Sequence, residues 1–330
     1  MDYKSIFNRI EKLNIMIIGD VMIDAYQWGK VERISPEAPV PICSVTKEED
    51  RLGGAGNVAL NISSMGAEPI LCSVIGQDNN GEILLNLLKE NNMTTEGIVL
   101  SKTRPTTIKT RVLGNNTQML RVDKEIIDFL NTEEETDFLK TIFDILNKKR
   151  IDAIIFQDYD KGVITENVIS QIVSKANERQ IPTTVDPKKR NFKNYKNVTM
   201  FKPNLKELKE GLKIEFTLPT MDNLSEASLL LNNKQRIEKV FITLSEYGVF
   251  IADYKQRQAK VKMISAHLRN IADVSGAGDT VISVATLCLA VGLEAEDIAR
   301  ISNLAGGLVC ETVGVTPINK ERLYKELLSL

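Results

Sequence analysis

The sequence is poor in the residues on which several common kinds of site depend. Its 330 residues include a single histidine, His267, and four cysteines. One imidazole is too few for the two-histidine zinc motifs, and the cysteines form no C-x-x-C pair. We therefore predict neither a zinc site nor a thioredoxin-type redox site. Widely spaced, reduced thiols also fit a cytoplasmic protein; they are Cys43, Cys72, Cys288 and Cys310.

Long apolar runs and an excess of charge are also missing. No stretch reaches the about 18 apolar residues of a membrane helix, and the charged N-terminal segment is unlike a signal peptide. The 42 basic and 44 acidic side chains give a formal net charge of -2, so no long-range field attracts nucleic acid or an anionic membrane. We expect neither as a partner.

The sequence does contain a regular alternation of short apolar runs and longer helical patterns. The alternation is typical of an α/β protein whose mostly parallel sheet is covered by helices on both faces. The apolar runs predict buried strands at residues 15–19, 70–76, 153–157, 183–185 and 240–244. The helical patterns lie at residues 57–65, 81–91, 132–149, 166–179 and 221–232.

Two stretches, residues 28–46 and 106–123, break this alternation. Both have the period of extended strands and lack crossover helices, so we expect them to pair as a small second sheet that forms a lid. No internal repeat or Pro/Gly-rich linker divides the chain, and residues 1–330 are expected to form one domain. The unpaired edges of a lid sheet favour pairing, which predicts a homodimer through the lid.

The strongest local signal for chemistry is ADVSGAGDT at residues 272–280, followed by a long apolar helix. Gly276 and Gly278 let backbone N–H groups converge at the positive end of that helix, which predicts an anion site. No Lys-Ser/Thr pair follows the glycines and no G-x-G-x-x-G spacing is present, so it is neither a Walker A loop nor a dinucleotide fingerprint. Asp279 is either the helix cap or a base that takes a proton from a hydroxyl beside a bound phosphoryl group.

A second glycine cluster, GGAGN at residues 53–57, precedes another helix. A charged loop rather than a strand comes before it, so a dinucleotide site is disfavoured. Paired glycines suit close backbone approach to a hydroxyl-rich ligand, with Asn57 as donor and acceptor, or a close helix-to-sheet contact without a ligand. Asp20 and Asp24 bracket the end of the first strand, where carboxylates are solvated or hold sugar hydroxyls.

Two further patterns have both a structural and a functional interpretation. Lys109 and Arg111 alternate along an expected strand, about 7 Å apart on one face, which suits either a phosphate clamp or a solvated face. In KPNLKE at residues 202–207, Asn204 and Glu207 have the spacing of a capping box. A glutamate at the carboxyl edge of a sheet is also suited to hold magnesium through water.

GGAGN, KPNLKE and ADVSGAGDT, in this order, resemble the motifs of the ribokinase-like (PfkB) carbohydrate kinases over essentially the whole chain. The resemblance implies a three-layer α/β sandwich with a β-sheet lid. Within the family, four segments look like the D-glycero-β-D-manno-heptose 7-phosphate kinase branch: GDVMID at 19–24, RISPEAPVP at 33–41, TIKTRV at 107–112 and DYDKG at 158–162. That branch uses ATP and Mg²⁺ to phosphorylate the anomeric hydroxyl, which gives the 1,7-bisphosphate for lipopolysaccharide core heptose.

The resemblance also implies roles for individual residues. Asp279 would be the catalytic base, beside an anion hole of Gly276, Ala277 and Gly278. The nucleotide contacts would be Asn204, Glu207 (to magnesium through water), Thr243, Ser245, Gly248 and, on the adenine side, Asn303. The sugar contacts would be Asp24, Gly54, Asn57, Asp158 and Lys161, with Lys109 and Arg111 for the 7-phosphate. Potassium would lie beside Asp273 and the carbonyl of Ser275.

The chain departs from the family pattern at three positions. Ser275 replaces the usual Thr and keeps its hydroxyl, Leu244 stands where related heptose kinases tend to have Arg, and Gln157 stands where Ser is common. In many bacteria this kinase is fused to a nucleotidyltransferase whose HxGH motif needs two histidines. With one histidine here, we expect that nucleotidyltransferase to be a separate protein.

Two other functions stay open on the sequence. One is a kinase of the same family for another sugar, such as ribose, fructose 1-phosphate or 2-keto-3-deoxygluconate. The other is a non-catalytic sugar or nucleotide sensor that has kept the fold. The intact Asp279 and its glycine turn argue against the sensor.

Overall fold

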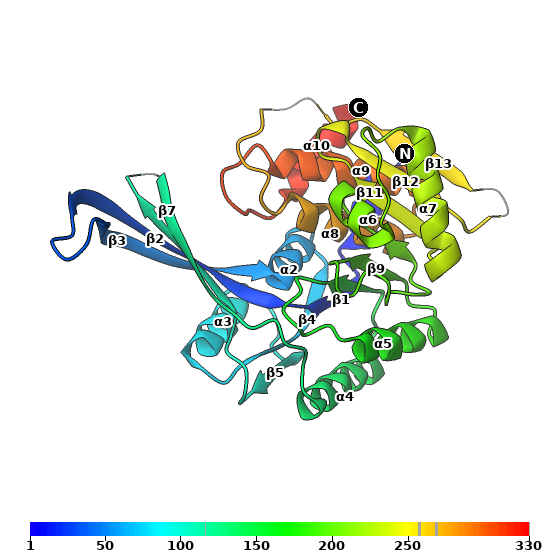
Figure 1. Ribbon diagram of the computed structural model, residues 1–330. Coiled ribbons are helices and arrows are strands. Elements are labelled where there is room, and N and C mark those ends of the chain that lie inside the picture. Colours follow the sequence, from blue (N-terminus) through cyan, green and yellow to red (C-terminus); the bar gives the residue numbers. More distant parts are fainter. Residues whose placement is uncertain (116, 257–258, 268–269, 330) are drawn as a thin grey trace.

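The computed structural model describes residues 1–115, 117–256, 259–267 and 270–329. In this part of the chain a twisted sheet of nine strands crosses the body of the molecule (Figure 1). Its strands pair in parallel except at one edge, where β12 and β13 are antiparallel. In spatial order they are β13 (Lys260–Ile264), β12 (Val249–Asp253), β11 (Lys239–Thr243), β10 (Met200–Phe201), β9 (Thr183–Asp186), β8 (Ala153–Gln157), β1 (Asn14–Gly19), β4 (Glu68–Gly76) and β5 (Ile98–Ser101).

Two apolar cores lie on opposite faces of this sheet. In β1, Ile15 and Ile17 enter one core while Met16 and Ile18 enter the other, as the period of two in a strand requires. The first core is covered by α1 (Tyr3–Ile10), α2 (Ala55–Ser64), α3 (Asn79–Glu90), α8 (Ala277–Ala290), α9 (Ala295–Val309) and α10 (Lys320–Ser329). The second is covered by α4 (Thr132–Lys148), α5 (Glu166–Glu178), α6 (Leu205–Leu212) and α7 (Met221–Gln235). The predicted three-layer α/β fold is confirmed.

The five predicted strands and the five predicted helices are all present, with ends shifted by at most three residues. The agreement has a physical basis, because both cores select apolar side chains at fixed spacing. The helix α8 is buried along most of its length, which explains the apolar run after the glycine turn. None of the helices in the described ranges combines the length and apolar character needed to cross a bilayer.

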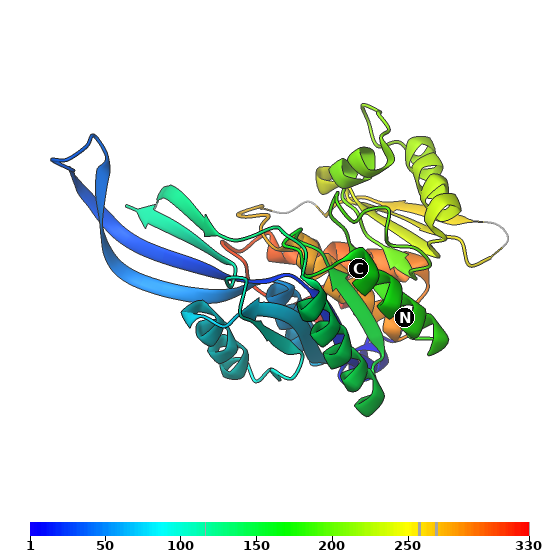
Figure 2. The ribbon, with the colours of Figure 1, turned by 60° about the horizontal axis from the view of Figure 1, so that its bottom comes forward.

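The second sheet has four strands in the order β3-β2-β6-β7. They are β2 (Val21–Ile34), β3 (Pro41–Gly54), β6 (Ile108–Gly114) and β7 (Thr117–Lys124). The long β2–β3 hairpin projects well away from the helices (Figures 1 and 2). The prediction of a second sheet is confirmed, but its first two strands are longer than expected: β2 starts directly after Asp20, and its pairing with β3 runs from Val21 opposite Gly54 to Ile34 opposite Pro41.

Candidate active site

The glycine turn before α8 is built for an open helix N-terminus. Gly276 is the N-cap, with φ of 80°, and no side chain of the described residues caps the helix. A Cβ at this position would also lie 3.0 Å from Val315 and 3.1 Å from the Asn57 amide nitrogen. Glycine is therefore required both by the positive φ and by this close approach. The backbone N–H groups of the first turn, at Ala277 and Gly278, are those that an anion would meet.

Asp279 does not cap this helix, so the alternative that it serves only as a cap is wrong. Its carboxylate points across the sheet edge to three side chains from two other elements. Asn57 Nδ2, at the start of α2, donates to Oδ2 at 2.6 Å. Gln157 Nε2, at the end of β8, and the Tyr159 hydroxyl donate to Oδ1 at 3.1 and 2.7 Å. The predicted pair Asn57 and Asp279 is thus in direct contact.

Burial changes the acidity of this group. Asp279 is 6% exposed, and the removal of its carboxyl from water raises the pKa of Asp279 to about 6. The hydrogen bonds from Asn57 and Tyr159 oppose that rise because they favour the ionised form. A carboxylate with a pKa near 6 is ionised at neutral pH and accepts a proton more readily than an ordinary aspartate.

A buried ion pair beside the glycine turn was not predicted from the sequence. Lys202 Nζ lies 2.9 Å from Asp186 Oδ2, and both side chains are at most 10% exposed. A Cβ at Gly278 would lie 3.9 Å from each of these two atoms. Asp186 ends β9 and Lys202 follows β10, so parallel strand ends bring the pair to the same edge as Asp279. The Lys202 ammonium and the carboxylates of Asp186 and Asp279 therefore lie at the edge that holds the turn.

The glycines of GGAGN make room for the acidic residues of the first strand's end. A Cβ at Gly53 would lie 2.4 Å from the Asp24 carboxylate, and one at Gly54 would lie 2.4 Å from the backbone oxygen of Asp20. Asp24 Oδ1 accepts a hydrogen bond from Arg111 Nη1 at 2.6 Å. Of the predicted sugar contacts, Asp24 therefore adjoins Gly53 and is joined to Arg111, whereas Gly54 adjoins the backbone of Asp20.

Asp158 is placed differently from a sugar contact. Its side chain accepts hydrogen bonds from Asp160 N, Asn191 Nδ2 and the Tyr195 hydroxyl, and it is 1% exposed. Burial raises the pKa of Asp158 to about 6. These contacts favour a structural role for Asp158 over the predicted contact with sugar.

The loop that follows Asp158 is anchored by Asp20. This buried carboxylate accepts hydrogen bonds from three backbone N–H groups, those of Tyr159, Lys161 and Val163. The sequence did not indicate this anchoring role of Asp20, because its partners lie about 140 residues away. The loop conformation that presents Tyr159 and Lys161 is fixed by this anchor.

Two of the predicted basic residues converge on one glutamate. Lys109 in the second sheet and Lys161 in the loop after β8 contact the two oxygens of Glu125, at 2.7 and 2.8 Å. Lys109 also contacts Asp123 at 2.9 Å. Arg111, predicted as the partner of Lys109, instead pairs with Asp24. The second sheet thus contributes cations to the site, each already opposed by a carboxylate.

The predicted nucleotide contacts lie at the start of α6 and around the loop after β11. Asn204 and Glu207 form a capping box at the start of α6, with bonds of 2.8 and 2.9 Å, and Glu207 also pairs with Lys188. A hollow of about 620 Å³ lies beside Asn204 and Ser245. The remaining residues surround the loop after β11: Thr243 ends that strand, Gly248 has φ of 91°, and Asn303 on α9 donates to the Ser265 carbonyl at 2.9 Å.

The donor set at this edge fits a hydrated magnesium ion. Among the described residues, no group of three or more His, Cys, Asp or Glu side chains is arranged to hold a metal. Magnesium needs no such cage, because it keeps several waters and binds through one or two carboxylates together with substrate phosphates. Glu207 and Asp186 supply such carboxylates, and the ion would supply charge neutralisation for the phosphates of ATP.

Asp273 organises the loop before the glycine turn. Its Oδ1 accepts from Ser275 N at 2.9 Å and its Oδ2 from Gly314 N at 3.0 Å. The hydrogen bonds from Ser275 lower the pKa of Asp273, so it stays ionised. A fixed carboxylate beside backbone carbonyls has the oxygen donors that a monovalent cation requires.

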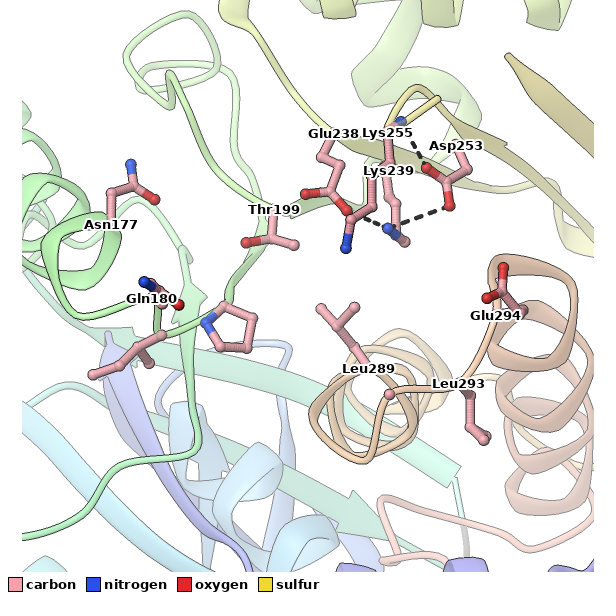
Figure 3. A pocket seen from close by; sticks show the side chains of 13 residues that line it. Asn177, Gln180, Thr199, Glu238, Lys239, Asp253, Lys255, Leu289, Leu293 and Glu294 are labelled. Carbon is pink, nitrogen blue, oxygen red and sulfur yellow. Dashed lines mark hydrogen bonds and ion pairs between the residues drawn. The ribbon is translucent and has the colours of Figure 1, made fainter. Parts of the chain in front are cut away.

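A separate cavity of about 440 Å³ lies at the other ends of the strands, where β9, β10 and β11 begin (Figure 3). Lys239 there pairs with Glu238 and with Asp253, the latter at 3.3 Å. Leu289, near the C-terminal end of α8, also lines it. Because Asp279 lies in the first turn of the same helix, about 15 Å away at 1.5 Å per residue, this cavity is distinct from the candidate site.

Solved structures identify the fold. The chain is similar to phosphofructokinase-2 from Escherichia coli in complex with potassium, with a TM-score of 0.76 and 20% identity over 97% of this chain and 100% of that one. It is also similar to the Arabidopsis thaliana ribokinase complexed with ribose and ATP, with a TM-score of 0.71 and 14% identity over 96% and 99% of the two chains. These likenesses establish a ribokinase-like fold.

Sequence comparison is more specific. The model of the pfkB family carbohydrate kinases matches residues 12–322, and the chain belongs to this family. Kinases of this family are phosphotransferases that act on a sugar hydroxyl and use ATP with a divalent metal ion.

Curated relatives include two proteins called bifunctional protein HldE. The one from Pelobacter propionicus is 39% identical over 96% of this chain, and the one from Geobacter sulfurreducens is 37% identical over 98%. The chain spans 63% and 65% of their respective lengths, so it matches a part of each.

Proposed function

We propose that this kinase transfers the γ-phosphoryl group of ATP to the anomeric hydroxyl of D-glycero-β-D-manno-heptose 7-phosphate. The product is the 1,7-bisphosphate, a precursor of lipopolysaccharide core heptose. The observation that carries the proposal is the convergence of Lys109 and Lys161 on Glu125, close to the loop that carries Tyr159. The similarity to the HldE proteins and the heptose-kinase-like segments of the sequence support it.

The chemistry follows from the position of Asp279. The anomeric hydroxyl donates its proton to the Asp279 carboxylate while its oxygen attacks the γ-phosphorus, and the bond from that phosphorus to the bridging oxygen of ADP breaks. The backbone N–H groups of residues 276–278 and the Lys202 ammonium stabilise the charge on the transferring group. Closure of the second sheet over the site would exclude the water that otherwise hydrolyses ATP.

The lysines give the substrate's own phosphate a place to bind. One carboxylate oxygen of Glu125 accepts a hydrogen bond from Lys109 and the other accepts one from Lys161, as two oxygens of a phosphate would. Binding of the 7-phosphate would therefore displace Glu125 from both ammonium groups. Arg111, held by Asp24, would help to orient the sugar hydroxyls rather than the phosphate.

The experiment is a coupled assay of ADP release with a panel of acceptors: the heptose 7-phosphate, ribose, fructose 1-phosphate and 2-keto-3-deoxygluconate. We expect the highest kcat/KM with the heptose 7-phosphate. A higher kcat/KM with another sugar would assign the enzyme to that sugar. No ADP release with any acceptor would favour the non-catalytic sensor.

The double variant Lys109→Ala/Lys161→Ala tests the phosphate site. Loss of two charged hydrogen bonds should raise the KM for the sugar phosphate by roughly 100-fold, with kcat much less affected. Lys175→Ala removes an ion-paired lysine on α5 and serves as the matched control, with no change in KM. An unaltered KM in the double variant would exclude these lysines as the phosphate site.

The second sheet also supports a proposed homodimer. Its outer strands β3 and β7 have free edges, and several of its apolar side chains are exposed, among them Ile34, Val45, Leu120 and Val122. Pairing with a second copy would cover both features.

For the monovalent cation, we propose Asp273 and the Ser275 carbonyl as ligands. Repeating the ADP assay with and without potassium tests this.

A further inference from the structure

The carboxylate of Asp279 is held asymmetrically. Gln157 Nε2 and the Tyr159 hydroxyl both donate to Oδ1, whereas Asn57 is the one described residue that donates to Oδ2. An ionised carboxylate has about four acceptor positions, two on each oxygen. Within the described ranges, three of the four are filled. The remaining position is on Oδ2, where a hydroxyl could donate without displacing a protein group.

The Gln157 side chain carries a second, independent observation. Gln157 is 2% exposed, and its Oε1 is buried without a hydrogen-bond partner among the described residues. A buried acceptor left unpaired loses its hydration without compensation. The amide keeps this orientation because its Nε2 must face the negative Oδ1 of Asp279. An unpaired polar atom maintained in a core indicates that the residue serves the site rather than packing.

Tyr159 is held from its backbone as well as through its hydroxyl. Its N–H donates to Asp20 Oδ2 at 2.8 Å, so the start of the loop is fixed to the end of β1. The ammonium group of Lys188 lies 5.9 Å from the centre of its ring. The hydroxyl is therefore delivered to Asp279 by a rigid segment and not by a freely rotating surface chain.

We propose that Tyr159 and Gln157 are positioning residues that fix Oδ1 of Asp279 and so turn Oδ2 toward the acceptor hydroxyl. This inference rests on the proposed role of Asp279 as the base. The hydrogen bond from Tyr159 also stabilises the ionised form of Asp279, which is the form that takes the proton. Because Gln157 stands at the end of β8 and Tyr159 two residues later, one strand end supplies both.

Tyr159→Phe tests the proposal, with Tyr195→Phe as its matched control. Tyr195 also donates from a buried hydroxyl to a buried carboxylate, but to Asp158. For Tyr159→Phe we expect kcat to fall roughly tenfold with little change in KM, and the acid limb of the pH profile to move to higher pH because the pKa of Asp279 rises. Tyr195→Phe should leave the acid limb in place.

Gln157→Leu separates positioning from packing. It removes the donor to Asp279 together with the unpaired Oε1, so we expect the thermal midpoint to stay the same or rise while kcat falls. A variant with unchanged kcat and an unchanged acid limb would overturn the positioning role. So would an acid limb that moves equally in Tyr159→Phe and Tyr195→Phe.

A direct titration distinguishes failure of this inference from failure of the proposed function. The carbon-13 signal of the Asp279 carboxyl, assigned by its loss in Asp279→Asn, reports the pKa without any substrate. A higher pKa of Asp279 in Tyr159→Phe supports positioning even if no acceptor sugar is turned over. An unchanged pKa in an active enzyme refutes positioning and leaves the kinase assignment intact.

Discussion

Asp279 and Asp158 have closely similar immediate surroundings. Each is buried, and each accepts hydrogen bonds from a tyrosine hydroxyl and from a side-chain amide. Burial raises the pKa of each to about 6. By acidity alone the two carboxylates are equivalent candidates for a general base.

Their wider surroundings differ. The partners of Asp158, Asn191 and Tyr195, are themselves 1% and 0% exposed, and the Tyr195 ring packs against Phe156 and Phe201. Asp279 lies in the first turn of α8 beside the exposed Gly278. In both regions the raised pKa reports burial of the carboxyl. Asp279 is the residue suited to catalysis because a substrate can reach it and because it lies at the positive end of a helix.

The sharpest test of this difference is a pair of equivalent substitutions. Asp279→Asn should lower kcat by about 10²–10⁴-fold, the usual contribution of a general base, while ATP still binds. Asp158→Asn should change kcat by only a few-fold. The measurements are steady-state ADP release and titration with ATP. Near-normal turnover by Asp279→Asn would remove it from the role of base.

The pH dependence is the next largest effect. Because protonated Asp279 cannot accept the hydroxyl proton, kcat/KM should fall tenfold for each pH unit below about pH 6. The same acid limb is expected in Asp158→Asn, since Asp158 does not touch the acceptor. The acid limb could instead disappear in Asp158→Asn and stay in place in a variant in which the pKa of Asp279 is shifted. Asp158 rather than Asp279 would then have to be assigned as the base.

Stability should show the smallest effect and should not separate the two residues. A carboxyl whose pKa is raised on folding favours the folded state at low pH, and that contribution is lost as pH rises from about 4 through about 6. Asp279→Asn and Asp158→Asn both remove an ionised buried group at pH 8. Each should raise the free energy of unfolding there by up to about 3 kcal/mol, measured by urea unfolding at pH 8 and compared with pH 4. A loss of stability at pH 8 would show that the hydrogen bonds to that carboxylate outweigh its burial.

Much of the fold was predictable because it depends on short-range patterns. Apolar spacing located the strands and helices of the main sheet, and period-two segments located the second sheet. The extent of β2 was underestimated because residues 21–25 are buried like a core strand and do not alternate. The short strand β10, of two residues, is set by its neighbours β9 and β11 rather than by its own sequence.

The site residues were predictable only where they lie close together in the sequence. Gly276, Gly278 and Asp279 stand together in the chain, and so do the glycines before Asn57. The donors Gln157 and Tyr159 lie 122 and 120 residues from Asp279, and no local pattern marks them. The same holds for Asp186 with Lys202 and for Glu125 between two lysines, since each depends on which strand ends are neighbours.

By itself the sequence determined an α/β fold with a second sheet, and a glycine turn that requires an open, positive helix end. These follow from backbone conformation and side-chain periodicity, which act over a few residues. Only the tertiary structure decided that Asp279 leaves its helix uncapped, that Asp158 has the same acidity without the same access, and that Lys109 and Lys161 share Glu125. Those outcomes depend on the order of strands and on burial, because a carboxylate acquires its pKa and its partners only when distant segments pack around it.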